Sequence, residues 1–475
     1  MNDLNNQISS TTVDDIYAES GYWHVNTGEE KIHAKRMPGK WRSLKWWANS
    51  FWILFFLGPY LRWDDRQAVL FDIPNRQFHI FSATILPQDF WMLALLLLFF
   101  AILLAVVTAV AGRVWCGFFC FQTVWTDLFT WIEEKLEGSP QKRRKLDDAP
   151  LSFAKVKTKV FKHSLWLLVA LFTGISFISW FNDSFTIWGD MLNLELGFAS
   201  TVIIGMFIGG TYLLAGFMRE QTCMWLCPYA RIQGVMIDDS TVLPAYDVAR
   251  GEPRGRIKKG ESDAERTTGD CVDCNQCVAV CPTGVDIRQG QQEGCITCAL
   301  CIDACDSVME RVGRPKGLIR YESLEGMEQG VSSDIRKRPR VWVYSTILLL
   351  ALSGIIYGLS TLDAIELKVL HERQPLFVMQ SDGSIQNKYT LKVLNKLTHD
   401  AEVTVTASGP EGLVLVGADS GFVARHGNAS AHNVFVRVPA DLLNVGSVPI
   451  TFTVVSTQGE GFSSSRTSVF IGPDK

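Results

Sequence analysis

The sequence has no excess of basic charge, no haem-attachment motif and no cysteine beyond residue 305. Its 475 residues carry a formal net charge of −4, so a nucleic-acid-binding surface of clustered Lys and Arg is not expected. No C-x-x-C-H motif occurs, which excludes a covalently attached c-type haem. Residues 1–30 are polar and lack the apolar core of a cleavable signal peptide. We therefore expect the first membrane span to act as an uncleaved anchor.

Eight of the twelve cysteines form two copies of the spacing C-x2-C-x2-C-x3-C. In bacterial ferredoxins, three cysteines of each such run bind one [4Fe–4S] cluster and the fourth binds the other cluster. Zinc also binds paired C-x2-C motifs, but it needs only four ligands and has no use for this longer run. The spacing therefore predicts two [4Fe–4S] clusters and one-electron chemistry. The predicted ligands are Cys271, Cys274, Cys277 and Cys305 for one cluster, and Cys281, Cys295, Cys298 and Cys301 for the other.

Apolar residues are concentrated in blocks long enough to cross a bilayer, for which about 20 residues are needed. One block is shorter than the others and contains Pro59 and Arg62. Five spans are predicted: Trp46–Trp63, Phe90–Gly112, Ser164–Phe181, Leu196–Phe217 and Val341–Ser360.

The connecting segments differ in their content of Lys and Arg, which predicts orientation because basic loops stay in the cytoplasm. Six basic residues precede the first span, ten lie between the second and third, and seventeen lie in 218–340, whereas 62–89 has three and 182–195 has none. Five spans then place the N-terminus and the cysteine runs in the cytoplasm and everything after residue 360 in the periplasm. All twelve cysteines fall on the cytoplasmic side, where thiols serve metals rather than structural disulfides.

The region after residue 360 alternates between apolar and polar residues and is rich in β-branched side chains. Turn sequences such as Ser381-Asp382-Gly383, 409–412 and 459–461 separate several of these runs. The pattern predicts an immunoglobulin-like sandwich without a disulfide. Its scattered histidines, His371, His399, His426 and His432, are interpreted as surface or loop residues rather than a metal site. The predicted strands are Ile365–Val378, Tyr389–Asn395, Ala401–Ala407, Asn433–Val438, Val448–Val455 and Ser464–Ile471.

Together these signals predict a multidomain membrane protein, with an α-helical transmembrane bundle, a cytoplasmic bacterial-type 2[4Fe–4S] ferredoxin-like domain and a C-terminal immunoglobulin-like β-sandwich. The predicted order is a cytoplasmic, partly disordered segment (1–45), four transmembrane helices (46–227), the ferredoxin-like domain (228–340), a fifth transmembrane helix (341–360) and a periplasmic β domain (361–475).

The remaining four cysteines form two C-x3-C motifs, each directly after a predicted span: Cys116 and Cys120, then Cys223 and Cys227. On a continuing helix the two sulfurs of each pair would share one face. Two spans followed by C-x3-C occur twice in the same direction, which predicts an internal repeat that brings the four thiols together. The alternative is that they are small buried residues in a bundle, which two identical spacings at equivalent positions disfavour.

Three chemical roles for these four thiols stay open at the level of sequence. They could hold a soft ion such as Cu(I), with Met224 beside them. They could bind a third iron–sulfur cluster. Each pair could instead cycle between dithiol and disulfide.

The combination of spans followed by C-x3-C, a double-cluster ferredoxin region and a C-terminal β domain resembles the cytochrome c oxidase accessory protein family, CcoG/FixG, which includes RdxA-like membrane polyferredoxins. The resemblance extends from about residue 30 to the end, and includes Gly39–Lys45, Leu70–Pro74, Phe78–Phe81 and Trp115–Asp127.

This resemblance implies a multi-pass protein of the bacterial inner membrane that assists assembly of cbb-type cytochrome c oxidase. It implies a cupric reductase, with the eight ferredoxin cysteines as electron relay and the four C-x3-C cysteines as the catalytic, metal-binding group. The implied partners are oxidase subunits, copper-handling assembly proteins and an unidentified electron donor; a homodimer stays open. The alternative is a subunit resembling NapH or NosR that carries electrons from quinol to a periplasmic reductase.

Overall fold

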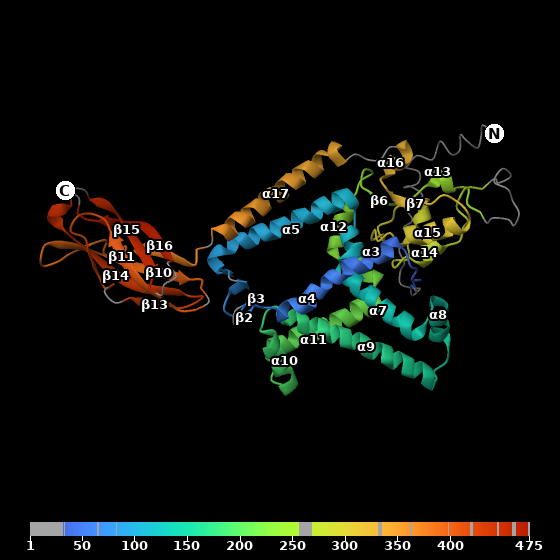
Figure 1. The fold of residues 1–475 in the computed structure, drawn as a ribbon, viewed down its shortest axis with the longest axis horizontal. Coiled ribbons are helices and arrows are strands. Elements are labelled where there is room, and N and C mark those ends of the chain that lie inside the picture. Colours follow the sequence, from blue (N-terminus) through green and yellow to red (C-terminus); the bar gives the residue numbers. More distant parts are fainter. Residues whose placement is uncertain are drawn as a thin grey trace. The chain divides into compact units, whose positions relative to one another are not determined.

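The computed structural model describes residues 32, 34–63, 66–81, 83–255, 268–330, 335–361, 363–397, 399–418, 421–443, 446–457 and 462–473. The chain divides into two compact units (Figure 1). One comprises the chain up to Leu57, Leu97–Ile178 and Asp190–Leu352; the other comprises Gly58–Leu96, Ser179–Gly189 and the chain from Ser353 onward. Most of the predicted N-terminal segment and the predicted turn at 459–461 lie outside the described residues.

Four helices in the described part of the chain are long and apolar enough to cross a membrane. They are α5 (Phe90–Ala111), α9 (Phe153–Ile178), α11 (Phe198–Leu213) with its π-helical extension η4 (Leu214–Met218), and α17 (Pro339–Ser360). Four of the five predicted spans are therefore continuous helices. Glycines allow close helix contacts: a Cβ at Gly174 of α9 would lie 3.1 Å from the carbonyl oxygen of Ile204 in α11.

The predicted span over Trp46–Trp63 is wrong as a single helix. The chain there forms α3 (Lys40–Asn49), η1 (Ser50–Trp52), α4 (Ile53–Leu57) and η2 (Gly58–Tyr60), and then enters strand β1 (Arg62–Trp63). The helix begins before the apolar run because Lys45 and Arg42 are buried against Asp127 of α7 (Phe121–Glu137). Pro59 lacks the N–H that a longer helix would need. The orientation derived from five spans stays a prediction.

The cysteine-rich region is framed by two antiparallel strands, β6 (Leu243–Tyr246) and β7 (Ile319–Glu322). Helices α14 (Gln276–Ala279) and α15 (Leu300–Arg311) lie between them in sequence, and Ile302, Met309 and Leu318 form the core beneath the cysteine loops. The remaining α-helices among the described residues are α6 (Val114–Phe118), α8 (Pro140–Asp148), α10 (Ser184–Asn193), α12 (Pro228–Met236), α13 (Val248–Gly251) and α16 (Leu324–Gln329).

The C-terminal region is a sandwich of two antiparallel sheets, which confirms the predicted immunoglobulin-like fold (Figure 1). One sheet has the order β12-β14-β10-β8, with β9 paired to β10, and the other has the order β13-β11-β15-β16. Tyr389, Phe452 and Phe470 are completely buried between them. The strands are β8 (Ile365–His371), β9 (Val378–Met379), β10 (Ser384–Asn395), β11 (Ala401–Ser408), β12 (Val414–Val416), β13 (Phe422–Ala424), β14 (Ala429–Pro439), β15 (Ser447–Ser456) and β16 (Ser463–Ile471).

The connection 62–89, which the sequence presents only as a loop, contains strands of its own. β1 pairs with β2 (Arg66–Gln67), and β3 (Val69–Asp72), β4 (Gln77–Ile80) and β5 (Ala83–Ile85) form a three-stranded sheet. Strands β1, β2 and β5 are shorter than the four to eight residues over which alternation is recognised, and β3 and β4 only reach the lower limit of about four residues.

Candidate redox site

The two cysteine runs of the ferredoxin-like region adopt the same unusual backbone. In each run the residues on both sides of the second cysteine are in the left-handed region: Asp273 and Asn275 at φ 47° and 53°, and Thr297 and Ala299 at φ 50° and 60°. This conformation costs about 1–2 kcal/mol for a residue other than glycine. Because this conformation recurs at equivalent positions, the two loops curve in the same way. Backbone N–H groups point at the sulfurs, as from Thr297 to Cys295 Sγ at 3.4 Å.

Thiols of the two predicted ligand sets lie near one another, and the crossed pairing that the spacing predicts stays a prediction. The pKa of Cys305 is raised to about 12, first by burial and then by Cys277, Asp306, Cys271 and Cys274. Burial likewise raises the pKa of Cys301, with further contributions from Cys298, Cys295, Cys281 and Cys277. We call these sets group I (Cys271, Cys274, Cys277, Cys305) and group II (Cys281, Cys295, Cys298, Cys301).

This arrangement fits two four-iron clusters. A [4Fe–4S] cluster takes one thiolate at each iron, so its ligands surround a space instead of meeting at a point. Structural zinc would require thiolates within about 2.3 Å of a single ion. Within the described ranges, no three His, Cys, Asp or Glu side chains converge in that way. The cysteine spacing, which supplies more thiolates than one zinc ion binds, favours the cluster interpretation of groups I and II over zinc.

The two C-x3-C motifs share a second backbone pattern, which differs from the predicted continuous helix. Cys116 lies in α6 and Cys120 is the extended residue before α7, at φ −61° and ψ 129°. Cys223 lies in the π-helical turn η5 (Thr222–Leu226), and Cys227 is the extended residue before α12, at φ −83° and ψ 106°. The prediction of one helix through each motif is wrong. At Cys227 the cause is Pro228, which disfavours the helical conformation in the residue before it.

The four C-x3-C thiols lie close together, as the internal repeat predicts. The pKa of Cys223 is raised to about 12, first by burial and then by the thiols of Cys120 and Cys227. The pKa of Cys116 is also raised, first by burial and then by Cys120, Cys223 and Cys227. The arrangement leaves all three roles open: a soft ion such as Cu(I), a third cluster and disulfide cycling.

Hydrogen bonds join the two motifs to each other. Gln122, two residues after Cys120, donates from Nε2 to the backbone oxygens of Leu214 (2.8 Å) and Arg219 (3.1 Å), which precede the second motif. Cys116 Sγ donates to Gln233 Oε1 of α12 at 3.1 Å. Each motif is therefore held by residues of the other repeat.

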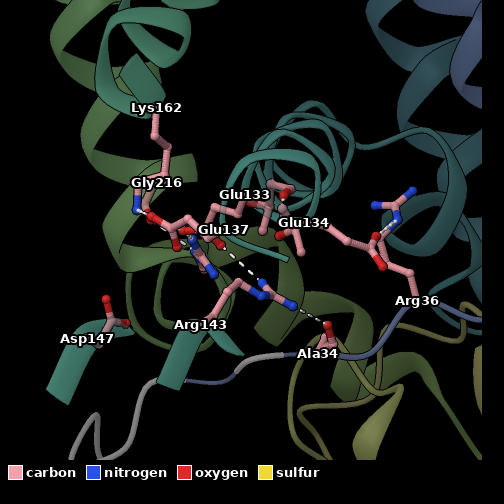
Figure 2. A network of polar contacts seen from close by, with 12 residues as sticks. Ala34, Arg36, Glu133, Glu134, Glu137, Arg143, Asp147, Lys162 and Gly216 are labelled. Carbon is pink, nitrogen blue, oxygen red and sulfur yellow. Dashed lines mark hydrogen bonds and ion pairs between the residues drawn. The ribbon is translucent and has the colours of Figure 1, made fainter. Parts of the chain in front are cut away.

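A buried network of ionic contacts positions the segment before Cys223 (Figure 2). Glu133 of α7 is fully buried and lies 2.8 Å from Arg219, 3.3 Å from Arg143 and 3.4 Å from Lys162. Arg219 also donates from Nε to the carbonyl oxygen of Gly216 at 2.9 Å, which closes the turn after η4. The buried carboxylate of Glu133 fixes this turn because it compensates the buried charge of Arg219.

Both C-x3-C motifs contact the loop that carries group II. A Cβ at Gly117 would lie 2.6 Å from the carbonyl oxygen of Ile296 and 3.0 Å from Cα of Cys298. A Cβ at Gly294 would lie 2.7 Å from Cε of Met224, in the second motif. Cys116 and Cys298 belong to one buried apolar cluster. Group II is thus in direct contact with the C-x3-C segments.

A cavity lined by both charged and apolar side chains reaches Cys223. Its lining includes Glu220, Arg219 and Thr283, two residues after Cys281. The sequence analysis did not identify Arg219, Glu133 or Gln122 as site residues. The available signal was an arginine between each span and its C-x3-C motif, Arg113 in the first repeat and Arg219 in the second.

Comparison with known proteins matches three parts of the chain to family models. Residues 218–324 match a 4Fe-4S dicluster domain, residues 93–139 a 4Fe-4S binding domain, and residues 355–473 the IG-like fold at the C-terminus of FixG. These matches support iron–sulfur clusters as cofactors.

Three curated relatives align with most of the chain. The nitrogen fixation protein FixG of Rhizobium meliloti is 39% identical over 415 residues, which are 80% of this chain and 79% of that protein. Protein RdxA of Cereibacter sphaeroides is 39% identical over 395 residues (80% and 83%), and RdxB of the same organism is 41% identical over 403 residues (82% and 84%). The chain therefore belongs to the FixG/RdxA family of membrane-bound iron–sulfur redox proteins.

Proposed function

We propose that this protein reduces Cu(II) to Cu(I) at the four C-x3-C thiols, using two [4Fe–4S] clusters as a one-electron relay, and that it does so to assist assembly of a cbb-type cytochrome c oxidase. The observation that carries the proposal is the direct contact between the C-x3-C segments and the loop of group II, at Gly117 and Gly294. Electrons that pass through the two clusters need an acceptor, and the C-x3-C segments lie next to group II.

The chemistry of the thiols suits copper. Thiolate ligands stabilise Cu(I) over Cu(II), so copper held here becomes easier to reduce. Each Cu(II) takes up one electron, which matches the single electron that a bound [4Fe–4S] cluster supplies.

The chain's own residues position and shield this reaction. Cys116 is 7% exposed and Cys298 is 8% exposed, so water has little access between the two groups. The Gln122 and Gln233 hydrogen bonds hold the repeats in register, and the contacts of Glu133 hold the turn before Cys223. The proposed reaction requires no movement of the C-x3-C segments.

A third iron–sulfur cluster is the second candidate for the same thiols. The specific observation in its favour is the match of residues 93–139 to a 4Fe-4S binding domain, because the only cysteines in that range are Cys116 and Cys120. In that case the thiols would extend the relay, as in a quinol-linked electron carrier, and copper would not be the acceptor.

One experiment separates these candidates. Anaerobically purified protein is reduced, freed of excess reductant, and given Cu(II) together with a Cu(I)-specific chelator; iron per chain is measured in parallel. We expect about eight irons from two clusters and formation of Cu(I). Replacing Cys223 and Cys227 with Ser should leave the iron unchanged and abolish copper reduction.

Thr222→Ser is the matched control, because it makes a change of similar size in the same turn and keeps both thiols. It should reduce copper at the wild-type rate. About twelve irons in the wild type, falling to about eight in the double variant, would contradict the copper site in favour of a third cluster. Unchanged copper reduction in the double variant would also contradict it.

A further inference from the structure

Arg113 is a buried cation at the meeting point of three cysteine-bearing segments. It lies three residues before Cys116, and its side chain is almost inaccessible, with the residue 6% exposed. Nη1 donates to the carbonyl oxygen of Glu293, two residues before Cys295, and Nη2 donates to that of Ala230, three residues after Cys227. One guanidinium thus joins both C-x3-C motifs to the group II loop.

No carboxylate in the described part of the chain forms an ion pair with Arg113, unlike Arg143 and Arg219, which share Glu133. Its Nε is buried without a hydrogen-bond partner there. A buried charge is costly unless an opposite charge compensates it. Two carbonyl dipoles supply only part of that compensation. The side chain therefore indicates a negative charge nearby that the amino acids alone do not provide.

The groups that face Arg113 are thiols on both sides. Its charge lowers the pKa of Cys116, Cys223 and Cys295, although burial raises the pKa of all three by more. Bound to metal, such thiols are deprotonated, and four thiolates give a metal centre net negative charge. The negative charge of these metal–thiolate centres would then compensate the positive charge of Arg113.

We infer that Arg113 is the shared internal counter-ion of two anionic metal–thiolate centres, the one on group II and the one on the C-x3-C thiols, and that it raises the reduction potential of both. Reduction adds one negative charge to a centre, and a nearby cation stabilises the reduced form. The part concerning the C-x3-C thiols rests on the proposed function; the part concerning group II does not.

The cation that acts on group I is compensated. Arg288 acts on Cys277, but Arg288 is paired with Asp286 and Asp273, each at 2.7 Å. The uncompensated charge of Arg113 beside group II would make group II the easier of the two clusters to reduce. Electrons would then pass from group I to group II.

Gly234 of α12 offers a way to neutralise Arg113 without removing it. A Cβ at Gly234 would lie 3.1 Å from Nη2 of Arg113. Gly234→Asp places a carboxylate beside the guanidinium, and Gly234→Asn places a neutral group of the same shape there. The readout is the reduction potential of each cluster from an EPR-monitored redox titration, with iron per chain measured on the same sample.

We expect Gly234→Asp to lower the higher of the two potentials so that its reduced-to-oxidised ratio at a fixed ambient potential falls at least tenfold, which is 59 mV for one electron. In Gly234→Asn the same reduction potential should change by less than a third of that shift. Equal shifts in both variants, or no shift in Gly234→Asp with its iron intact, would overturn the inference.

Arg113→Met and Arg113→Lys keep the test decisive if the Gly234 variants lose iron. Arg113→Met should lower the same potential and Arg113→Lys should keep it. Arg231→Met, which removes an exposed arginine of α12, the helix that carries Gly234, should leave the potential unchanged. A lowered potential in the Lys variant would also overturn the charge assignment. If wild-type protein fails to reduce copper while these shifts occur, the proposed function fails and the role of Arg113 at group II stands.

Discussion

Gly117→Ala probes the contact between the first C-x3-C motif and the group II loop. The added methyl carbon would lie 2.6 Å from the carbonyl oxygen of Ile296, about 0.8 Å short of an ordinary contact of 3.4 Å, and 3.1 Å from the backbone N of Cys298. These are backbone atoms and cannot rotate aside, so the two segments must separate. Overpacking of this kind costs about 1–3 kcal/mol.

The displaced residues lie between two ligands of one predicted cluster, so the loss should be local. We expect Gly117→Ala protein to lose iron from group II while group I keeps its four, bringing the total from about eight towards about four, and copper reduction should fall with it. Iron per chain, the EPR spectrum of the reduced protein and the midpoint of thermal unfolding would be measured together.

Gly294→Ala is the matched control, since it adds the same methyl group to the same loop. Its nearest neighbour is Cε of Met224 at 2.7 Å, the far end of a flexible side chain that can adopt another rotamer. This variant should keep both clusters. If Gly117→Ala retains full iron and stability, or if the two variants behave alike, the close backbone contact does not determine the integrity of group II and the reasoning is refuted.

Three further predictions follow from the rest of the structure. Cys305→Ser should remove the group I cluster and Cys301→Ser the group II cluster, and iron analysis with EPR should find about four irons in each; loss of both clusters in each variant would contradict independent sites. Glu133→Gln removes the carboxylate that the buried Arg143 and Arg219 share, while Lys162 keeps Glu137 at 3.0 Å. Thermal unfolding should therefore occur at a lower temperature, with a cost on the order of 3–5 kcal/mol; an unchanged midpoint would argue against the network. If the orientation from five spans is right, alkaline phosphatase fused at the C-terminus should be active and at Gly255 inactive, and equal activity of both fusions would place the two regions on one side.

The errors made from sequence have identifiable physical causes. The run Trp46–Trp63 is apolar enough to suggest a span, but the helix that covers its start is anchored by Lys45 and Arg42 against Asp127, some 80 residues away. Helical spacing through each C-x3-C motif was assumed to persist, and extended residues at Cys120 and Cys227 interrupt it. Strands β12 and β13 have three residues each and give no periodic signal.

What the sequence determined by itself is local chemistry and local periodicity. The spacing of eight cysteines predicts their division into groups I and II because that division is set by short loops, and the apolar runs predict four helices because span length is a property of consecutive residues. Alternation likewise predicts the strands of the sandwich, whose buried residues recur at every second position of β10.

Only the tertiary structure decided how these parts act on one another. Gly117 contacts residues 296–298, and Arg113 bonds to residues 230 and 293, although more than a hundred positions separate them in the chain. No periodicity encodes such pairs, because the cost of a buried charge or an absent methyl group depends on which distant atoms surround it. The sequence supplies the redox groups, and the packing around Gly117 and Arg113 sets which of them are adjacent and which charge they share.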